Sequence, residues 1–278
     1  MEINDHQNND EGYYLKMVSG AFYIPRNRTL KPLGEDAHFI CADRQTIGVA
    51  DGVGGWAAYG IDAGKYAREL MLNSAIAAAR NSKGQADHDR GHDVDPKRVL
   101  REAFSRCAEV EGSSTACIVA HNDGALLAAN VGDSGFMVFR DGKLLYKSPI
   151  QQHVDCVPCP PPYQLGNGVA CDRPECASEM KVEVTAGDIV VLGSDGLLDN
   201  LLAPQIEKIL ETKRGRDGIQ PEGLAKELAD VAYSKSLDYG GKRDDITVVV
   251  GQIIYDKHKP LSALRRLLRL CCSFFFSS

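Results

Sequence analysis

Acidic residues stand at several points where an apolar run of this chain ends in a turn. They are Glu35-Asp36, Asp51, Asp133, Asp195 and Asp244-Asp245. Carboxylates in turns can meet at one edge of a sheet, and ligand sets made only of oxygen suit Mg²⁺ or Mn²⁺ better than zinc. Two such ions about 4 Å apart can hold a bridging water and stabilise an in-line displacement at phosphorus.

Each of these acids also has a simpler interpretation. Asp-Gly, found at Asp51 and Asp195, is among the most common turn dipeptides. An aspartate just before a helix is usually a cap for the first N–H groups. The spacing therefore establishes acids in turns and leaves open whether they bind metal.

The elements that must position these acids begin with β-hairpins. Apolar runs at residues 37–41 and 46–50 predict one hairpin, which ends at Asp51. The turn signals Asn122-Asp123-Gly124 and Asp141-Gly142 lie between strand-like runs and predict two more. Later strands are expected at residues 182–184, 189–192 and 246–254.

Helices are expected in pairs. Apolar residues recur at helical spacing over residues 62–80, and Asp95-Pro96 supplies a cap and a first-turn proline for a helix that reaches about Val110. Pro204 and Pro221 each open a further helix. Hairpins with paired helices predict an α+β fold, in which antiparallel sheets lie in the middle and helix pairs pack outside, rather than a doubly wound parallel sheet.

Composition indicates an ordinary globular protein. The chain has 278 residues, 44% hydrophobic and 25% charged, and a formal net charge of −6. This acidic balance argues against a nucleic-acid partner, which usually needs a basic face. Nine cysteines without a secretory signal favour a reducing, intracellular compartment. Cytoplasm or nucleus is the expected location, with plastid and mitochondrion left open.

The ends of the chain differ from its centre. Residues 1–16 are polar and acidic and are expected to be a disordered lead-in, followed by one folded domain at residues 17–256. Residues 257–278 combine a leucine stripe, arginines, Cys271-Cys272 and three phenylalanines. This tail is either an irregular extension or a basic amphipathic segment with acylation sites that contacts a membrane.

A loop expected at residues 151–180 concentrates cysteines. The four are Cys156, Cys159, Cys171 and Cys176. Three interpretations remain open: free thiols, a structural zinc site, and an oxidisable regulatory pair. The prolines 160–162, directly after the first pair, disfavour the tight turn that a zinc site needs.

Six segments, taken together and in order, resemble the type 2C family of metal-dependent protein serine/threonine phosphatases. They are GEDAHFI (34–40), GVADGVGGW (48–56), GSSTACIV (112–119), NVGDSGF (130–136), GSDGLLDN (193–200) and GGKRDDITVVV (240–250). The Trp56 after the double glycine resembles the plant and organellar branch. The resemblance implies a β-sandwich flanked by α-helix layers, a four-layer αββα fold, and makes residues 17–256 the catalytic domain.

The resemblance also implies a role for each acid. Asp51 would bridge two Mg²⁺ or Mn²⁺ ions, and Asp195 and Asp244 would complete the first metal site. The Gly52 carbonyl, Glu35 and Asp36 would serve the second site. Asp133 matches an acid linked to a third, weaker metal, which makes two or more ions per chain.

Three positions depart from the family pattern. Lys31 stands where many members have an arginine that clamps phosphate, and lysine offers a point charge rather than a bidentate fork. Val53 stands where many members have a histidine that is a candidate general acid. Asp245 replaces a frequent asparagine.

The expected function is hydrolysis of phosphoserine and phosphothreonine in a phosphorylated protein partner, by a monomer, through attack of a water that bridges the two metals. No cysteine is followed by arginine at the Cys-x₅-Arg spacing, so a cysteine nucleophile is not indicated. Two alternatives remain: a silent relative that binds phosphoproteins, favoured by Val53 and Lys31, and a structural metal-binding domain.

Overall fold

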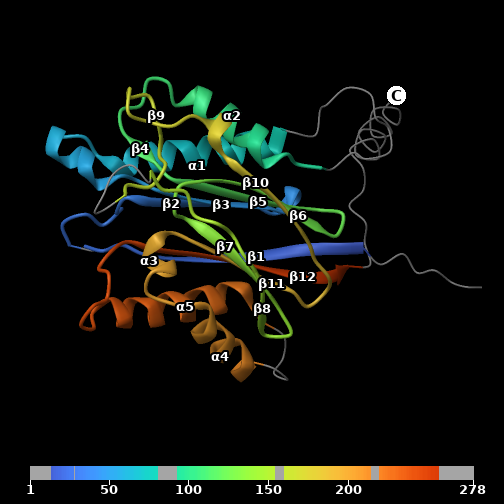
Figure 1. The fold of residues 1–278 in the computed structure, drawn as a ribbon. Coiled ribbons are helices and arrows are strands. Elements are labelled where there is room, and N and C mark those ends of the chain that lie inside the picture. Colours follow the sequence, from blue (N-terminus) through green and yellow to red (C-terminus); the bar gives the residue numbers. More distant parts are fainter. Residues whose placement is uncertain (1–13, 28, 81–92, 154–159, 214–218, 257–278) are drawn as a thin grey trace, which may run out of the picture.

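The computed structural model describes residues 14–27, 29–80, 93–153, 160–213 and 219–256. The expected lead-in up to residue 13, the tail at 257–278 and two of the loop cysteines, Cys156 and Cys159, lie outside this part. Two five-stranded antiparallel sheets form the centre (Figure 1). Helices cover the outer face of each sheet.

Sheet A is the lower sheet in Figure 1. Its strands, in spatial order, are β1 (Tyr14–Ile24), β12 (Ile246–Asp256), β11 (Ile189–Gly193), β7 (Gly135–Arg140) and β8 (Lys143–Lys147). Beneath it lie α3 (Asp195–Leu198), α4 (Ala203–Lys213) and α5 (Pro221–Ser236). Apolar residues of these helices and of the lower face of sheet A form one buried cluster.

Sheet B is the upper sheet. Its strands, in spatial order, are β10 (Ser178–Glu183), β6 (Ala125–Val131), β5 (Ala116–Asn122), β3 (Thr46–Asp51) and β2 (Asp36–Cys41). Above it lie α1 (Ala63–Arg80) and α2 (Pro96–Arg106), packed on a second buried cluster. A third cluster lies between the two sheets. The four-layer αββα arrangement expected for the fold is confirmed.

Local sequence signals explain several elements. Asp123 and Gly124 both have positive φ, and so do Asp141 and Gly142, as the two-residue turns of hairpins require. The Asp95 side chain accepts hydrogen bonds from Lys97 N and Arg98 N, which caps α2 as expected. The helix ends at Arg106, before the expected end at Val110.

Strand β1 carries no clear strand signal in the sequence. It begins at Tyr14, before the expected boundary at residue 17, and pairs with β12 along its whole length. Its fully buried residues are Met17, Gly20 and Ile24. Because this spacing is closer to three and a half residues than to two, alternation does not identify the strand.

The expected loop at 151–180 contains short elements. Strand β9 (Leu165–Gly166) pairs with β4 (Ser113–Ser114), a 3₁₀ turn covers Pro174–Cys176, and β10 begins at Ser178. Such two-residue strands are too short to show a pattern in the sequence.

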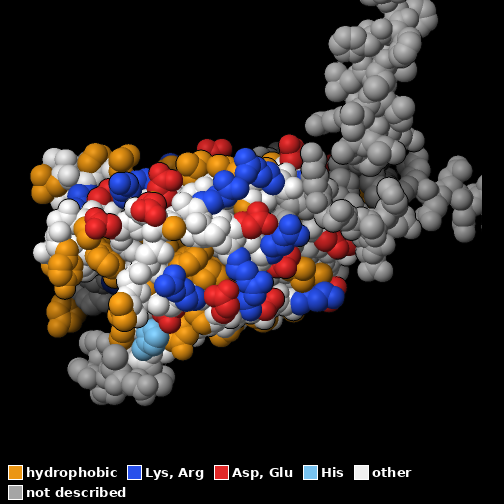
Figure 2. Space-filling model, turned by 90° about the horizontal axis from the view of Figure 1, so that it is seen from above, with side chains coloured by type: hydrophobic (Ala, Val, Ile, Leu, Met, Phe, Trp, Pro, Cys, Tyr) orange, Lys and Arg blue, Asp and Glu red, His pale blue; other side chains and the backbone are white. Residues whose placement is uncertain are grey.

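The surface seen from above, over α1 and α2, mixes acidic and basic side chains (Figure 2). Helix α2 carries the Arg98–Glu102 ion pair along one of its own faces. Among the helices in the described part of the chain, none is long and apolar enough to cross a membrane.

Candidate active site

The predicted acids come together at one end of the sandwich. Asp51 is the last residue of β3 and pairs in register with Asp36, the first residue of β2. Asp195 opens α3, separated by one residue from the end of β11, and Asp244 lies shortly before β12. Sheet B therefore supplies the first two carboxylates and sheet A the other two.

Asp36 links the two sheets at this point. Its Oδ2 accepts hydrogen bonds from Ser194 Oγ at 2.6 Å and from Thr247 Oγ1 at 2.7 Å. Ser194 lies between β11 and α3, and Thr247 lies in β12. Because Asp36 is only 3% exposed, these hydroxyls replace the water that a buried carboxylate loses.

The carboxylates of the cluster have raised pKa values, because burial and neighbouring negative charges disfavour their ionised forms. Burial raises the pKa of Asp36 to about 8, although the hydrogen bonds from Ser194 and Thr247 act in the opposite direction. Burial also raises the pKa of Asp51 well above its usual range, and the charges of Asp36, Asp195 and Asp244 add to that effect. A cluster of this kind needs protons or cations to be stable.

The donor set fits hard divalent cations. Asp36 Oδ1 and Asp195 Oδ1 are buried and have no hydrogen-bond partner. Buried carboxylate oxygens without partners are rare, and a bound cation would satisfy both. Within the described residues, however, no three acidic, histidine or cysteine side chains form a preassembled coordination shell.

A lysine lies among the acids of sheet A. The Lys242 ammonium contacts Asp195 Oδ2 and lies 3.3 Å from Asp199 Oδ2 and 3.5 Å from Asp244 Oδ2. Burial alone would lower the pKa of Lys242, but Asp195 and then Asp244 raise it above its usual value. This ammonium therefore remains charged beside the cluster.

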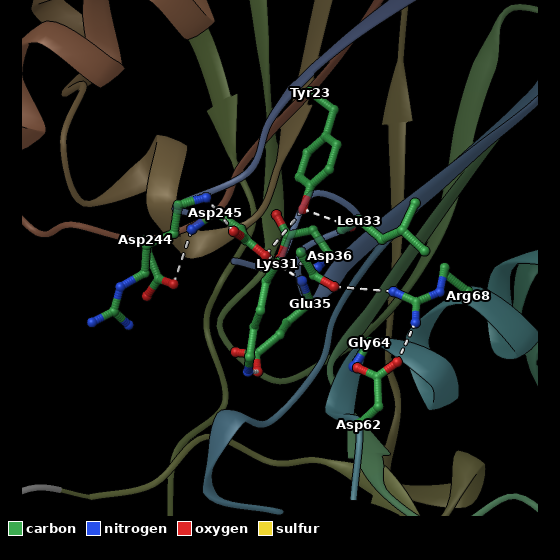
Figure 3. A network of polar contacts seen from close by, with 12 residues as sticks. Tyr23, Lys31, Leu33, Glu35, Asp36, Asp62, Gly64, Arg68, Asp244 and Asp245 are labelled. Atoms are coloured by element: carbon green, nitrogen blue, oxygen red, sulfur yellow. Dashed lines mark hydrogen bonds and ion pairs between the residues drawn. The ribbon is translucent and has the colours of Figure 1, made fainter. Parts of the chain in front are cut away.

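Asp245 holds the turn that carries Glu35 (Figure 3). Its two carboxylate oxygens accept from Tyr23 Oη at 3.0 Å, Arg26 N at 2.5 Å, Asp36 N at 3.2 Å and Glu35 N. Asp245 is 5% exposed, so these four donors replace its hydration. Its role is to fix the backbone next to the cluster.

A second contact fixes the same turn from the side of α1. Arg68 donates to the Gly34 carbonyl at 3.0 Å and to Asp62 Oδ2 at 2.5 Å (Figure 3). The Glu35 side chain points away from this contact, toward Lys31, whose Nζ lies 2.7 Å from Glu35 Oε1. The candidate phosphate clamp is thus paired with a candidate metal ligand.

Gly52 occupies a place that admits no side chain. A Cβ there would lie 2.5 Å from the Ala63 carbonyl oxygen and 2.7 Å from that of Glu35. Its neighbour Val53 offers no group that can transfer a proton. Trp56 anchors the following 3₁₀ turn, because its Nε1 donates to Ser113 Oγ at 2.6 Å.

Asp133 lies at the edge of the cluster, in the turn between β6 and β7. Burial raises its pKa to about 6, and the charge of Asp195 contributes. It lines a cavity of about 120 Å³ together with Lys147, Gln152 and Asp199. Thr115 lies nearby in the core, and its Oγ1 accepts from Asp51 N at 3.1 Å.

Sequence reasoning missed the residues that organise these ligands. Tyr23 lies in the unrecognised strand β1, and Arg68 is one of several charges on a helix. Ser194 and Thr247 lie within two of the motifs, but a hydroxyl near an acid carries no signal of its own. Lys242 and Arg243 form a basic pair directly before Asp244-Asp245, but the sequence does not show which of the two faces the acids.

Comparisons of sequence show which proteins this chain is similar to. The family model for Stage II sporulation protein E (SpoIIE) matches residues 47–253. The chain is 43% identical to "Probable protein phosphatase 2C 55" of Arabidopsis thaliana, over 88% of this chain and 53% of that protein. It is 36% identical to "Protein phosphatase PTC7 homolog fig" of Drosophila grimshawi, over 79% of each.

Solved structures share the fold. The photosystem II phosphatase PBCP superposes with a TM-score of 0.71 at 28% identity, covering 88% of this chain and all of that one. The catalytic domain of the phosphatase PstP, in complex with two manganese ions, gives 0.61 at 21% identity over 86% and 99%. The chain spans about half the length of the first two curated relatives that it matches. The match covers 53% of one and 59% of the other.

Proposed function

The chain belongs to the protein phosphatase 2C and SpoIIE family, and on this premise we propose that it is a metal-dependent protein serine/threonine phosphatase. The observation that supports this most directly is the convergence of Asp36, Asp51, Asp195 and Asp244, with two buried carboxylate oxygens left without partners. Its partner would be a phosphorylated protein, inside a cell.

The metal ligands we propose are the acids and the one carbonyl that the family motif matches. They are Glu35, Asp36, Asp51, Gly52, Asp133, Asp195 and Asp244. Mg²⁺ or Mn²⁺ held by these groups would activate water and neutralise charge on the phosphoryl group. In the net reaction the bond from phosphorus to the serine or threonine oxygen breaks, and a bond from phosphorus to a water oxygen forms.

The chain's own side chains have distinct tasks in this proposal. Asp245 and Arg68 hold the turn at Glu35 in place through backbone contacts. Lys31, which is 54% exposed at its side chain, would exchange its contact with Glu35 for one with the substrate phosphate. Since Val53 cannot donate a proton, the departing alkoxide must take its proton from another group.

Hydrolysis of phosphopeptides tests the proposal. We expect a phosphothreonine peptide to release phosphate with Mn²⁺ and not with EDTA, and a matched phosphotyrosine peptide to react much more slowly. Binding of the phosphothreonine peptide without turnover, under every metal condition, would reject the enzyme and support a phosphoprotein-binding module.

A further inference from the structure

Two glycines directly before Lys242 set the direction of the chain at this residue. Gly240 has a φ of +87°, and a Cβ on Gly241 would lie 2.2 Å from the Lys235 carbonyl oxygen. The double glycine therefore lets the chain turn tightly against the end of α5. Lys242 emerges from this turn toward α3.

Asn200 docks the Lys242 backbone on the segment that follows α3. Lys242 N donates to Asn200 Oδ1 at 3.0 Å, and Asn200 Nδ2 donates to the Lys242 carbonyl at 2.8 Å. The same amide donates to the Gly196 carbonyl at 2.8 Å, and Asn200 is 8% exposed. The lysine is thus attached to the short helix that carries Asp195.

The side chain places one positive charge among three acids. Its ammonium contacts Asp195 and lies within 3.5 Å of both Asp199 and Asp244. The two oxygens of Asp195 therefore differ: Oδ2 faces the lysine, whereas Oδ1 is buried without a partner. An ion bound at Oδ1 would leave the ammonium in place, but an ion bound between Asp199 and Asp195 Oδ2 would have to displace it.

We propose that Lys242 is a built-in counter-cation of the carboxylate cluster, which takes the place of one divalent ion between Asp195, Asp199 and Asp244. The proposal rests on the metal-binding function proposed above. It has two consequences. The ammonium stabilises the metal-free protein by offsetting repulsion among the acids, and it limits how many divalent ions the cluster binds and how tightly.

The test compares Lys242→Gln with the wild-type chain by two measurements that do not depend on activity. Melting temperatures are recorded in EDTA and in Mn²⁺, and Mn²⁺ binding is followed by titration calorimetry. Lys242→Arg keeps the charge and should behave like the wild type. Lys181→Gln is the matched control, because Lys181 pairs with Glu183 at 2.8 Å on the exposed strand β10.

We expect Lys242→Gln to melt about 2–4 °C lower than the wild type in EDTA, and to lose most of that difference in Mn²⁺. We also expect it to bind one more Mn²⁺ ion, or to bind Mn²⁺ on the order of tenfold more tightly. An equal drop in melting temperature under both conditions, with unchanged Mn²⁺ binding, would show that Lys242 only packs and would overturn the proposal.

The two proposals fail in different ways. A wild-type chain that binds no Mn²⁺ would reject the metal-binding function. The counter-cation would then stand if Lys242→Gln is less stable than the wild type in EDTA and Lys242→Arg restores stability. The counter-cation proposal would fail if the wild type, Lys242→Gln and Lys242→Arg had the same melting temperature in EDTA.

Discussion

Asp245 differs from its neighbour Asp244 in what it does, although the two are adjacent in the sequence. Asp244 faces the cluster, where burial and the charge of Asp195 raise its pKa. Asp245 points away and accepts from three backbone N–H groups and a tyrosine hydroxyl. Adjacent residues that precede a strand point in opposite directions, so one acid serves the site and the other serves the backbone beside it.

Replacing Asp245 by alanine leaves the N–H groups of Arg26, Glu35 and Asp36 without an acceptor. We expect a loss of about 2–4 kcal/mol in the free energy of unfolding, since buried donors that lose a charged acceptor are costly. Urea unfolding measures this free energy for the variant and the wild type. Asp230→Ala, on the exposed face of α5, is the control and should change stability by less than about 0.5 kcal/mol. Similar losses in both variants would contradict the assigned role of Asp245.

The valine at position 53 leads to a separate prediction about the leaving group. Val53→His places an acid beside the cluster, which should speed release of the threonine alkoxide, a poor leaving group that needs a proton. p-Nitrophenolate is a good leaving group and departs without a proton. We expect kcat to rise about tenfold for a phosphothreonine peptide and to change little for p-nitrophenyl phosphate. An equal change for both substrates would show that the histidine does not act as an acid.

At the scale of elements, the site depends on how closely α1 approaches the end of β3. Gly52 lies between the carbonyls of Ala63 and Glu35, so the helix and the Glu35 turn meet at a residue without a side chain. This contact sets the spacing between the two carboxylates of sheet B and the 3₁₀ turn that follows them.

Gly52→Ala tests this packing. A methyl group 2.5 Å from the Ala63 carbonyl oxygen must push backbone apart, which we expect to cost about 1–3 kcal/mol and to reduce phosphate release. The control is Gly55→Ala, because a Cβ at Gly55 meets nothing within 4 Å. Unfolding and hydrolysis are measured for both. If the two variants were equally stable and active, the close approach would not matter.

Hairpins and capped helices were predictable because their signals are local. Asn122-Asp123-Gly124 and Asp95-Pro96 determine their turns and cap from neighbouring residues alone. Strand β1 was not predictable, because its partner β12 lies at the other end of the chain and its buried residues do not alternate. The acids could be picked out by type, but their supports, such as Tyr23 and Arg68, depend on contacts between distant segments.

At the scale of the whole molecule, the sandwich brings together acids from both sheets. Asp36 and Asp51 belong to sheet B, Asp195 and Asp244 to the ends of sheet A, and Asp36 bridges them through Ser194 and Thr247. Neither sheet alone carries the whole set. The arrangement explains how acids from four short motifs, far apart in the sequence, come to lie together.

The central claim is that this cluster holds the divalent ions that hydrolysis requires, and Asp51→Asn tests it most directly. Mn²⁺ binding and release of phosphate from a phosphothreonine peptide are measured on protein shown to be folded, with Asp43→Asn as the control in an exposed turn. We predict weaker Mn²⁺ binding and a loss of more than about 100-fold in hydrolysis for Asp51→Asn alone. A folded Asp51→Asn protein that binds Mn²⁺ and releases phosphate like the wild type would contradict the claim.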